Sequence, residues 1–290
     1  MKILIIQEKG RHLKNQNFRE ALNLHRALER QGVESIVWGL NYDNFSIKFE
    51  EVSRDCDAVV LLENYEVNNW VPNLSKFKGL KLFWSIDSHC ILETHVKTCE
   101  KHEIDIVLNA VYGHGDSFKN QKSIYFPNAY PSDLIKPQKD VIKKGVGFCG
   151  NWLNRGEWIN HIERSGIPVK KDIFVIGDDM VSTINSYKVH FNRNISDDIN
   201  FRTFETLGCR TFLLTNHTPG LEKLFDIGEN IITYSDKNDL IEKVKYYLEN
   251  DNERNEITIK GYEHVKNNHT YDNRAEQLVD IINKNANKIF

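Results

Sequence analysis

The chain has 290 residues, of which 40% are hydrophobic and 27% are charged, and its formal net charge is −3. This composition is that of a folded globular protein and argues against intrinsic disorder. The acidic balance gives no general attraction for nucleic acid or anionic membranes, and the length is sufficient for two domains of ordinary size.

In the first half, short apolar runs alternate with helical patterns. A helix is predicted over residues 17–31, where the apolar residues keep roughly helical spacing. Runs rich in Val, Ile, Leu or aromatic residues predict strands over residues 2–6, 35–38, 58–62, 81–85, 104–108 and 123–126. Short strands separated by helices or loops favour a parallel α/β sheet.

Residues 127–144 carry three of the six prolines and a run of charge, which predicts a linker. The strand pattern then restarts, with strands predicted over 146–149, 172–176, 190–192, 211–214 and 230–234 and helices over 239–249 and 273–287. We therefore predict two Rossmann-like lobes, residues 1–130 and 145–290, that face a cleft and end in a helical C-terminus.

The segment 192–222 is the most informative part of the chain. Asp197 and Glu205 lie eight residues apart around the start of a predicted amphipathic helix, which ends at Gly208. A helix N-terminus favours phosphate, and nearby carboxylates accept hydrogen bonds from sugar hydroxyls. Together these features predict a nucleotide-sugar site. For Asp197 the alternative is a helix-start charge that the helix dipole stabilises.

The loop after the first strand of the second lobe offers groups for a diphosphate. Gly150 allows close backbone approach, Asn151 follows it, and Arg155 is suited to neutralise charge on the leaving group. Arg193 and Arg202 are rival cations, each with a surface salt bridge as the alternative.

Two further motifs are interpreted as structural. Glycines 145, 147 and 150 satisfy G-x-G-x-x-G, but they precede and end a predicted strand instead of turning into a helix. Asp55 and Asp57 have the D-x-D form of a metal site, yet they precede a strand and are interpreted as loop charges.

In the first half, His89 follows an apolar strand, at the end where parallel sheets bind ligands. Asp87 points the same way along an extended chain and is placed to orient His89, which is suited to act as a general base. A structural histidine is the alternative, and His95 is a weaker candidate. These residues lack a convincing fourth metal ligand, so no metal is predicted.

A basic loop follows the first strand. Gly10 permits a tight turn there, and Arg11, His12 and Lys14 supply polar and positive groups. We predict that this loop contacts the acceptor, with a solvated basic loop as the alternative.

These residues resemble a known family. The pattern N-x-R-x-F-E from Asn200 to Glu205, followed by residues 208–216, 218–225 and 269–274, is similar to the CgeB/spore-maturation glycosyltransferase-like family within the GT-B glycosyltransferases. In the first half, F-W-S-I-D-S-H (residues 83–89) resembles the same group.

The resemblance implies a GT-B fold, with the nucleotide on the C-terminal lobe and the acceptor on the N-terminal lobe. It implies no metal and no cofactor beyond the donor. Because members of the family usually take UDP-sugars, it also implies that the donor is a UDP-sugar. Many GT-B enzymes carry an E-x7-E motif whose second glutamate holds the ribose, and Glu205 matches it. Asp197, at the first position, is one methylene shorter, and Asn200 and Arg202 belong to the same nucleotide site.

The sequence thus predicts a metal-independent glycosyltransferase with a saccharide or other hydroxyl acceptor. One alternative keeps the donor site and transfers sugar to a modified DNA base. The other is a non-catalytic protein that binds sugar nucleotides or serves in surface assembly. The odd number of cysteines, which lack C-x-x-C spacing, and an N-terminus without a signal-peptide pattern predict a cytoplasmic location.

Overall fold

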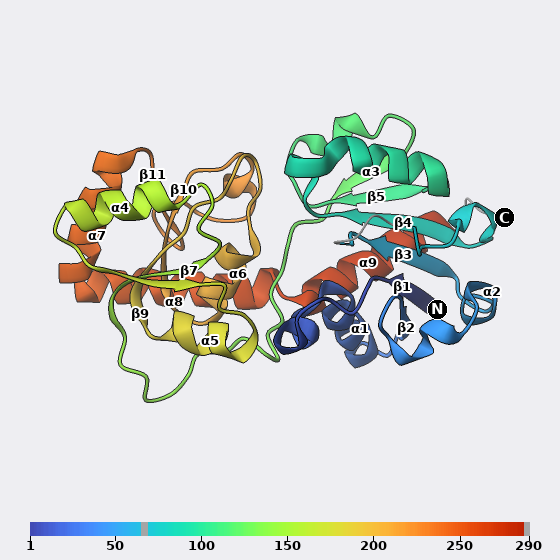
Figure 1. The fold of residues 1–290 in the computed structure, drawn as a ribbon, viewed down its shortest axis with the longest axis horizontal. Helices are drawn as coiled ribbons and strands as arrows, with labels where there is room; N and C mark the ends of the chain where they lie inside the picture. Colours follow the sequence, from blue (N-terminus) through green and yellow to red (C-terminus); the bar gives the residue numbers. More distant parts are fainter. Residues whose placement is uncertain (65–68, 287–290) are drawn as a thin grey trace. The chain divides into compact units, whose positions relative to one another are not determined.

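The computed structural model describes residues 1–64 and 69–286, which form two compact units. The first unit contains Met1–Pro127 together with the chain from Tyr271, and the second contains Asn128–Thr270. Each unit is built on one parallel sheet flanked by helices (Figure 1). The prediction of two Rossmann-like lobes is therefore confirmed.

The sheet of the first unit has six strands in the order β2-β1-β3-β4-β5-β6. Its strands are β1 (Lys2–Ile6), β2 (Glu34–Trp38), β3 (Ala58–Leu62), β4 (Leu80–Ser85), β5 (Ile106–Asn109) and β6 (Lys122–Tyr125). Its helices are α1 (Glu20–Arg30), α2 (Phe49–Val52), α3 (Ser88–His102) and α9 (Tyr271–Ala286), with 3-10 turns η1 (Leu13–Phe18), η2 (Asp43–Ser46), η3 (Leu74–Lys76) and η4 (His114–Ser117). All neighbouring strands are parallel, so their carboxyl ends share one edge.

Alternate side chains of these strands pack on opposite faces. Leu4, Phe83 and Val107 join a core cluster that includes Cys99 of α3. On the other face, Trp84 packs against Tyr271 of α9 with ring centroids 6.2 Å apart. The sheet is therefore covered on both faces, as expected for a parallel sheet.

The sheet of the second unit has five parallel strands in the order β11-β10-β9-β7-β8. Its strands are β7 (Lys144–Gly150), β8 (Val169–Ile173), β9 (Tyr187–Phe191), β10 (Phe212–Asn216) and β11 (Ile232–Tyr234). Its helices are α4 (Gly156–Arg164), α5 (Gly177–Asn185), α6 (Phe201–Gly208), α7 (Lys237–Glu249) and α8 (Asp251–Asn268), with the 3-10 turn η5 (Leu221–Lys223). Residues of α4, α7 and α8 share one core cluster with the strands.

The C-terminal helix differs from the predicted domain boundaries, which put residues 145–290 in one lobe. Helix α9 packs on the first unit, where Arg30 of α1 donates to Asp272 (2.8 Å) and Arg274 donates to the carbonyl oxygen of Pro127 (2.7 Å). Its apolar residues Ala275, Leu278 and Ile282 are buried there. Periodicity predicts such an apolar stripe but cannot say which sheet it covers.

The predicted linker, residues 127–144, is largely packed within the second unit. Ala129, Tyr130 and Ile135 are buried, and the N–H of Tyr130 donates to the carbonyl oxygen of His269 (3.1 Å). A Cβ added to Gly208 would lie 2.6 Å from the Tyr130 ring, so this segment is fitted closely against α6. Proline content alone did not reveal this packing.

Several predicted elements differ from the observed ones in extent; the strand predicted over 190–192, for example, is β9 and begins at Tyr187. The helix predicted over 17–31 is broken at Arg19, between η1 and α1. The strand predicted over 172–176 begins earlier, at Val169. Across residues 1–64 and 69–286, none of the helices has the length and apolar character needed to cross a membrane.

Candidate functional site

A buried network of amide side chains follows strand β9. Asn192 donates to Oγ1 of Thr215 (3.1 Å), and Asn194 donates to Oγ1 of Thr218 (3.0 Å). Oδ1 of Asn194 in turn accepts from the backbone N–H of Asn200 (3.1 Å). Asn192 and Asn194 are only 3% and 1% exposed. The loop between β9 and α6 is therefore held firmly against the end of β10.

The network fixes where helix α6 begins. Asn200 occupies the N-cap position, and its Oδ1 accepts from the N–H of Thr203 (3.3 Å). The first N–H groups of a helix lack partners within the helix, and with the helix dipole they favour an anion. The start of α6 thus offers a place for phosphate at the carboxyl edge of the second sheet.

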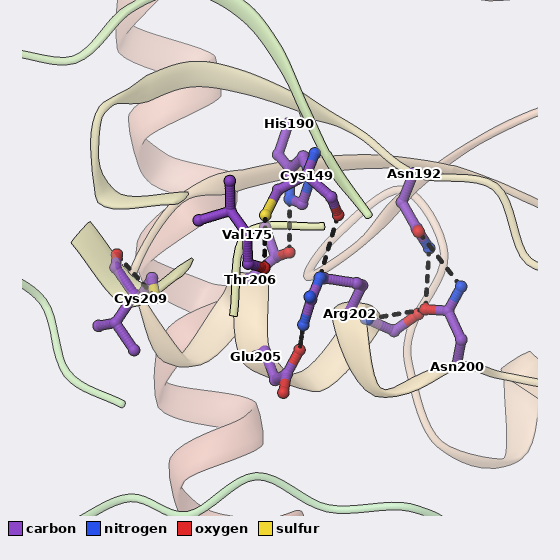
Figure 2. Close-up of polar contacts among 11 residues, drawn as sticks. Cys149, Val175, His190, Asn192, Asn200, Arg202, Glu205, Thr206 and Cys209 are labelled. Atoms are coloured by element: carbon purple, nitrogen blue, oxygen red, sulfur yellow. Dashed lines mark hydrogen bonds and ion pairs between the residues drawn. The ribbon is translucent and has the colours of Figure 1, made fainter. Parts of the chain in front are cut away.

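Arg202 and Glu205 form an ion pair one turn apart on α6 (Figure 2). Arg202 also donates from Nε to the carbonyl oxygen of Cys149 at 3.0 Å. The pair uses Oε2 of Glu205; among the described residues, Oε1 accepts no hydrogen bond. The Glu205 side chain is 12% exposed. One carboxylate oxygen is therefore free to accept from a ligand hydroxyl, and its role as ribose ligand stays a prediction.

His190 connects β9 to both β7 and α6. Its Nε2 accepts from the N–H of Cys149 (3.2 Å), so the ring proton is on Nδ1, which donates to Oγ1 of Thr206 (2.6 Å). Burial, with a smaller contribution from the charge of Arg202, lowers the pKa of His190 to about 3. His190 is therefore a neutral structural group under the candidate site.

The predicted diphosphate loop lies at the same edge of the sheet. Strand β7 ends at Gly150, and Oδ1 of Asn151 accepts from the N–H of Leu153 (3.0 Å), which shapes the turn. Arg155 occupies the N-cap position of α4 and donates from Nε to the carbonyl oxygen of Arg193 (3.1 Å). Gly150, Asn151 and Arg155 are thus brought to the loop that precedes α6.

Arg193, the rival cation, has a contact of its own. Its guanidinium lies 4.0 Å from the ring centroid of Trp158, a cation–π geometry. Burial lowers the pKa of the Arg155 guanidinium, the nearby Asp198 carboxylate raises it, and Arg202 and Arg193 lower it further. Three guanidinium groups therefore gather near the start of α6, where the carboxylates of Asp198 and Glu205 offset part of their charge.

The glycines that match G-x-G-x-x-G lie along strand β7 and not in a strand-to-helix turn. A Cβ added to Gly147 would lie 2.1 Å from the ring of Tyr187, so packing explains this glycine. The hydroxyl of Tyr187 donates to Asp172 on β8 (2.6 Å). Tyr187 is a core residue within the second sheet.

Asp197 and Asp198 lie in the loop that the amide network holds. Asp198 is 7% exposed, whereas Asp197 is half-buried. Ser196, just before them, has a φ of 53°, in the left-handed region. Contact between Asp197 and a donor sugar stays a prediction.

In the first unit, Asp87 and His89 follow β4 at the carboxyl edge of its sheet. Asp87 occupies the N-cap position of α3, and its N–H donates to Oε2 of Glu63 (2.7 Å). His89 lies in the first turn of α3, ahead of Ile91, whose φ of −135° interrupts the helix.

His95 points into the core and is 2% exposed. Its Nδ1 pairs with Oγ of Ser85 (2.8 Å), and its Nε2 lies 3.1 Å from Oε2 of Glu63. Burial raises the pKa of Glu63, but the bonds from His95 and Asp87 outweigh burial and hold it below its usual value. Sequence reasoning missed Glu63, which supports the Asp87 turn.

The basic loop follows β1, at the same sheet edge as Asp87. Gly10 has a φ of 95°, and a Cβ there would lie 3.0 Å from Cδ of Arg19, so both conformation and packing require glycine. Arg11, His12 and Lys14 are exposed. Each unit thus gathers its own set of predicted site residues at the carboxyl edge of its sheet.

Comparison with known proteins gives a consistent picture. The family model described as glycosyl transferase-like matches residues 134–280. No match is found among curated protein sequences.

Several solved structures share the fold over nearly the whole chain. One is sucrose-phosphate synthase from Thermosynechococcus elongatus, 12% identical with a TM-score of 0.71, covering 98% of both chains. Another is T4 phage β-glucosyltransferase, 14% identical with a TM-score of 0.71, covering 97% of this chain and 99% of that one. A third is an α-glucosyltransferase in complex with UDP and a DNA 13-mer containing an HMU base, 12% identical with a TM-score of 0.66, covering 98% and 99%.

Proposed function

The chain belongs to the glycosyl transferase-like family, and from this premise we propose that it transfers a sugar from a UDP-linked donor to a hydroxyl acceptor. One observation carries the proposal: a buried amide network presents the N-terminus of α6, with Glu205 one turn further along. Uridine as the base is supported by the complex of the α-glucosyltransferase with UDP. Within the family, the motifs around Asn200 and Glu205 favour the CgeB/spore-maturation group.

In this proposal the donor binds to the second unit. The diphosphate accepts hydrogen bonds from the first N–H groups of α6 and from the backbone at Gly150 and Asn151, and Arg155 offsets its charge. Glu205 accepts from the ribose hydroxyls through Oε1, while Arg202 holds Oε2. Asp197 contacts the transferred sugar.

The acceptor side belongs to the first unit. The acceptor oxygen attacks the anomeric carbon, the bond from that carbon to the diphosphate oxygen breaks, and UDP leaves. In an inverting reaction His89, oriented by Asp87, takes the acceptor proton. In a retaining reaction His89 holds the sugar, and an oxygen of the leaving diphosphate takes the proton. Arg11, His12 and Lys14 supply hydrogen-bond donors for a polar acceptor.

The proposed reaction needs no divalent metal, because guanidinium groups and a helix N-terminus stabilise the leaving diphosphate. We also propose a cytoplasmic setting. All five cysteines are free thiols and four of them are buried, which suits a reducing compartment.

A modified DNA base is a second candidate acceptor, favoured by the fold shared with an α-glucosyltransferase bound to DNA. The net charge of −3 argues against tight binding of the DNA backbone. If DNA is the acceptor, its affinity for the protein should fall steeply as salt is raised, whereas a neutral saccharide should bind with little salt dependence.

A thermal-shift screen against UDP, GDP, CDP, ADP and dTDP, each with magnesium or with EDTA, tests the proposal. A ligand at a hundredfold excess over its Kd stabilises the native state by about 2.7 kcal/mol. We expect UDP to raise the midpoint more than the other nucleotides, and to the same extent in EDTA. A shift that requires magnesium would contradict metal independence, and no shift with any nucleotide would contradict the donor site.

A further inference from the structure

A cavity of about 610 Å³ opens in the second unit at the edge opposite the proposed donor site. Its lining includes Lys188 near the start of β9 and Phe212 at the start of β10. These are the amino-terminal ends of parallel strands whose carboxyl ends lead to Asn192 and Asn216. The cavity is therefore separate from the site assigned to the nucleotide sugar.

The charged side chains that line the cavity are mostly positive. Lys143, Lys188, Arg210 and Arg254 face a single carboxylate, that of Asp251. Lys188 and Arg254 both pair with Oδ1 of Asp251, each at 2.6 Å. Lys143 and Arg210 pair with no carboxylate of the described residues. The lining thus carries an excess of three positive charges, which an anionic ligand would balance.

Lys143 points its ammonium group toward neutral acceptors. Its Nζ donates to the carbonyl oxygen of Asn185 (2.8 Å) and to Oγ1 of Thr211 (2.6 Å). Burial lowers the pKa of Lys143 to about 8; Cys209 acts against this, and Arg210 lowers the pKa further. Asn185 is the last residue of α5, so one of these bonds also caps that helix. Capping of α5 explains the position of Lys143 but not that of the nearby Arg210.

Arg210 is held in an unusual backbone conformation. It follows the C-cap Cys209 of α6 with a φ of 49°, the left-handed region in which glycine is the usual residue. A non-glycine residue there is strained, and such strain persists only where the surrounding structure holds the residue in place. The Arg210 side chain is exposed and lines the cavity.

We propose that this cavity binds a small phosphate-bearing molecule, with Lys143 and Arg210 contacting its phosphate oxygens. Guanidinium groups match the geometry of phosphate, and several cations around one volume suit a compact ligand with more than one negative charge. The cations surround a cavity and do not form the extended stripe that a nucleic-acid backbone requires. Helix α6 starts in the donor site and ends at Gly208, two residues before Arg210, so it runs from one site to the other.

The first test uses pyrophosphate as the probe, titrated calorimetrically in saturating UDP so that the donor site is filled. Arg210→Gly removes one cation and relieves the left-handed strain, so this variant should fold well. Arg164→Ala, at an exposed arginine at the end of α4, is the control. We expect Arg210→Gly to bind pyrophosphate at least tenfold more weakly and Arg164→Ala to bind like the wild type.

The second test labels Lys143 directly with pyridoxal 5′-phosphate, which carries a phosphate and an aldehyde. The aldehyde condenses with a neutral amine with loss of water, borohydride reduces the imine, and peptide mapping identifies the lysine. We expect Lys143 to be labelled, pyrophosphate to protect it, and Arg210→Gly to reduce the labelling.

Three results would overturn the proposal. The first is pyrophosphate binding that Arg210→Gly leaves unchanged. The second is binding that UDP abolishes, which would locate pyrophosphate in the donor site. The third is binding of duplex DNA at this cavity without binding of pyrophosphate. If UDP itself does not bind, the titration still tests the cavity, so the two proposals fail separately.

Discussion

Arg202 and Glu205 form an ion pair on α6, and Arg202 also donates to the carbonyl oxygen of Cys149 on β7. The pair therefore joins the helix that would hold the ribose to the strand that would approach the diphosphate. Their side chains are 21% and 12% exposed, so neither charge is well hydrated and each depends on the other.

Replacing Arg202 with Met should lower the free energy of unfolding by about 3 kcal/mol, because Glu205 keeps a poorly hydrated charge without its partner. Urea unfolding measures this loss. Lys171→Met is the matched control, since Lys171 pairs with Glu163 near the surface, where ion pairs contribute about 0–1 kcal/mol. Equal losses in the two variants would show that the α6 pair has no special role.

Glu205→Gln should weaken UDP binding at least tenfold, which corresponds to about 1.4 kcal/mol. The amide keeps the shape of the side chain but loses the charge that strengthens hydrogen bonds from the ribose hydroxyls. Calorimetric titration with UDP measures the change. Glu163→Gln, which breaks a partly exposed ion pair on α4, should bind UDP like the wild type. An unchanged affinity in folded Glu205→Gln protein would remove Glu205 from the site.

Asn194→Ala should destabilise the protein by about 2 kcal/mol, because it leaves buried partners of Asn194 without their hydrogen bonds. It should also speed amide exchange in the first turn of α6, which the network holds. Denaturant unfolding and hydrogen exchange measure the two effects. Asn252→Ala, at an exposed position on α8, should change neither, and a similar result for both variants would refute the role of the network.

His190 should make the protein sensitive to acid. Its pKa is about 3 in the folded state and about 6.5 when unfolded, so the unfolded state binds the proton more readily. The stabilisation from neutral His190 is complete above pH 6.5 and is lost, by about 1.4 kcal/mol per pH unit, as the pH falls toward 3. The advantage of the wild type over His190→Gln should shrink between pH 6 and 4. A constant difference would contradict this assignment.

The sheet strands were largely predictable from sequence because their side chains are buried on both faces. The run at Ala58–Leu62 is wholly apolar, and the predicted strand has the observed bounds. Helix α8 was not predicted, because its first turn is polar and its buried residues include Arg254 and Thr258 as well as apolar ones. Pattern reasoning finds apolar stripes and misses helices that bury polar side chains.

The residues of the candidate site were predictable from sequence only where they lie close together along the chain. Asn200, Arg202 and Glu205 are close in sequence, and the structure brings them to one helix. The partners Thr215 and Thr218 lie on other segments, so no local pattern marks them. A salt bridge was the predicted alternative for Arg202, and the i, i+3 spacing of Arg202 and Glu205 also offered a signal for which carboxylate is its partner.

The central claim is that this chain uses a UDP-sugar as glycosyl donor. The most direct test is to measure UDP release from UDP-glucose and related UDP-sugars in EDTA, without added acceptor. A competent donor site slowly transfers the sugar to water. We predict measurable UDP release by the wild type, at least tenfold less by Glu205→Gln, and an unchanged rate for Glu163→Gln. No release from any UDP-sugar, or a rate that Glu205→Gln leaves unaltered, would contradict the account.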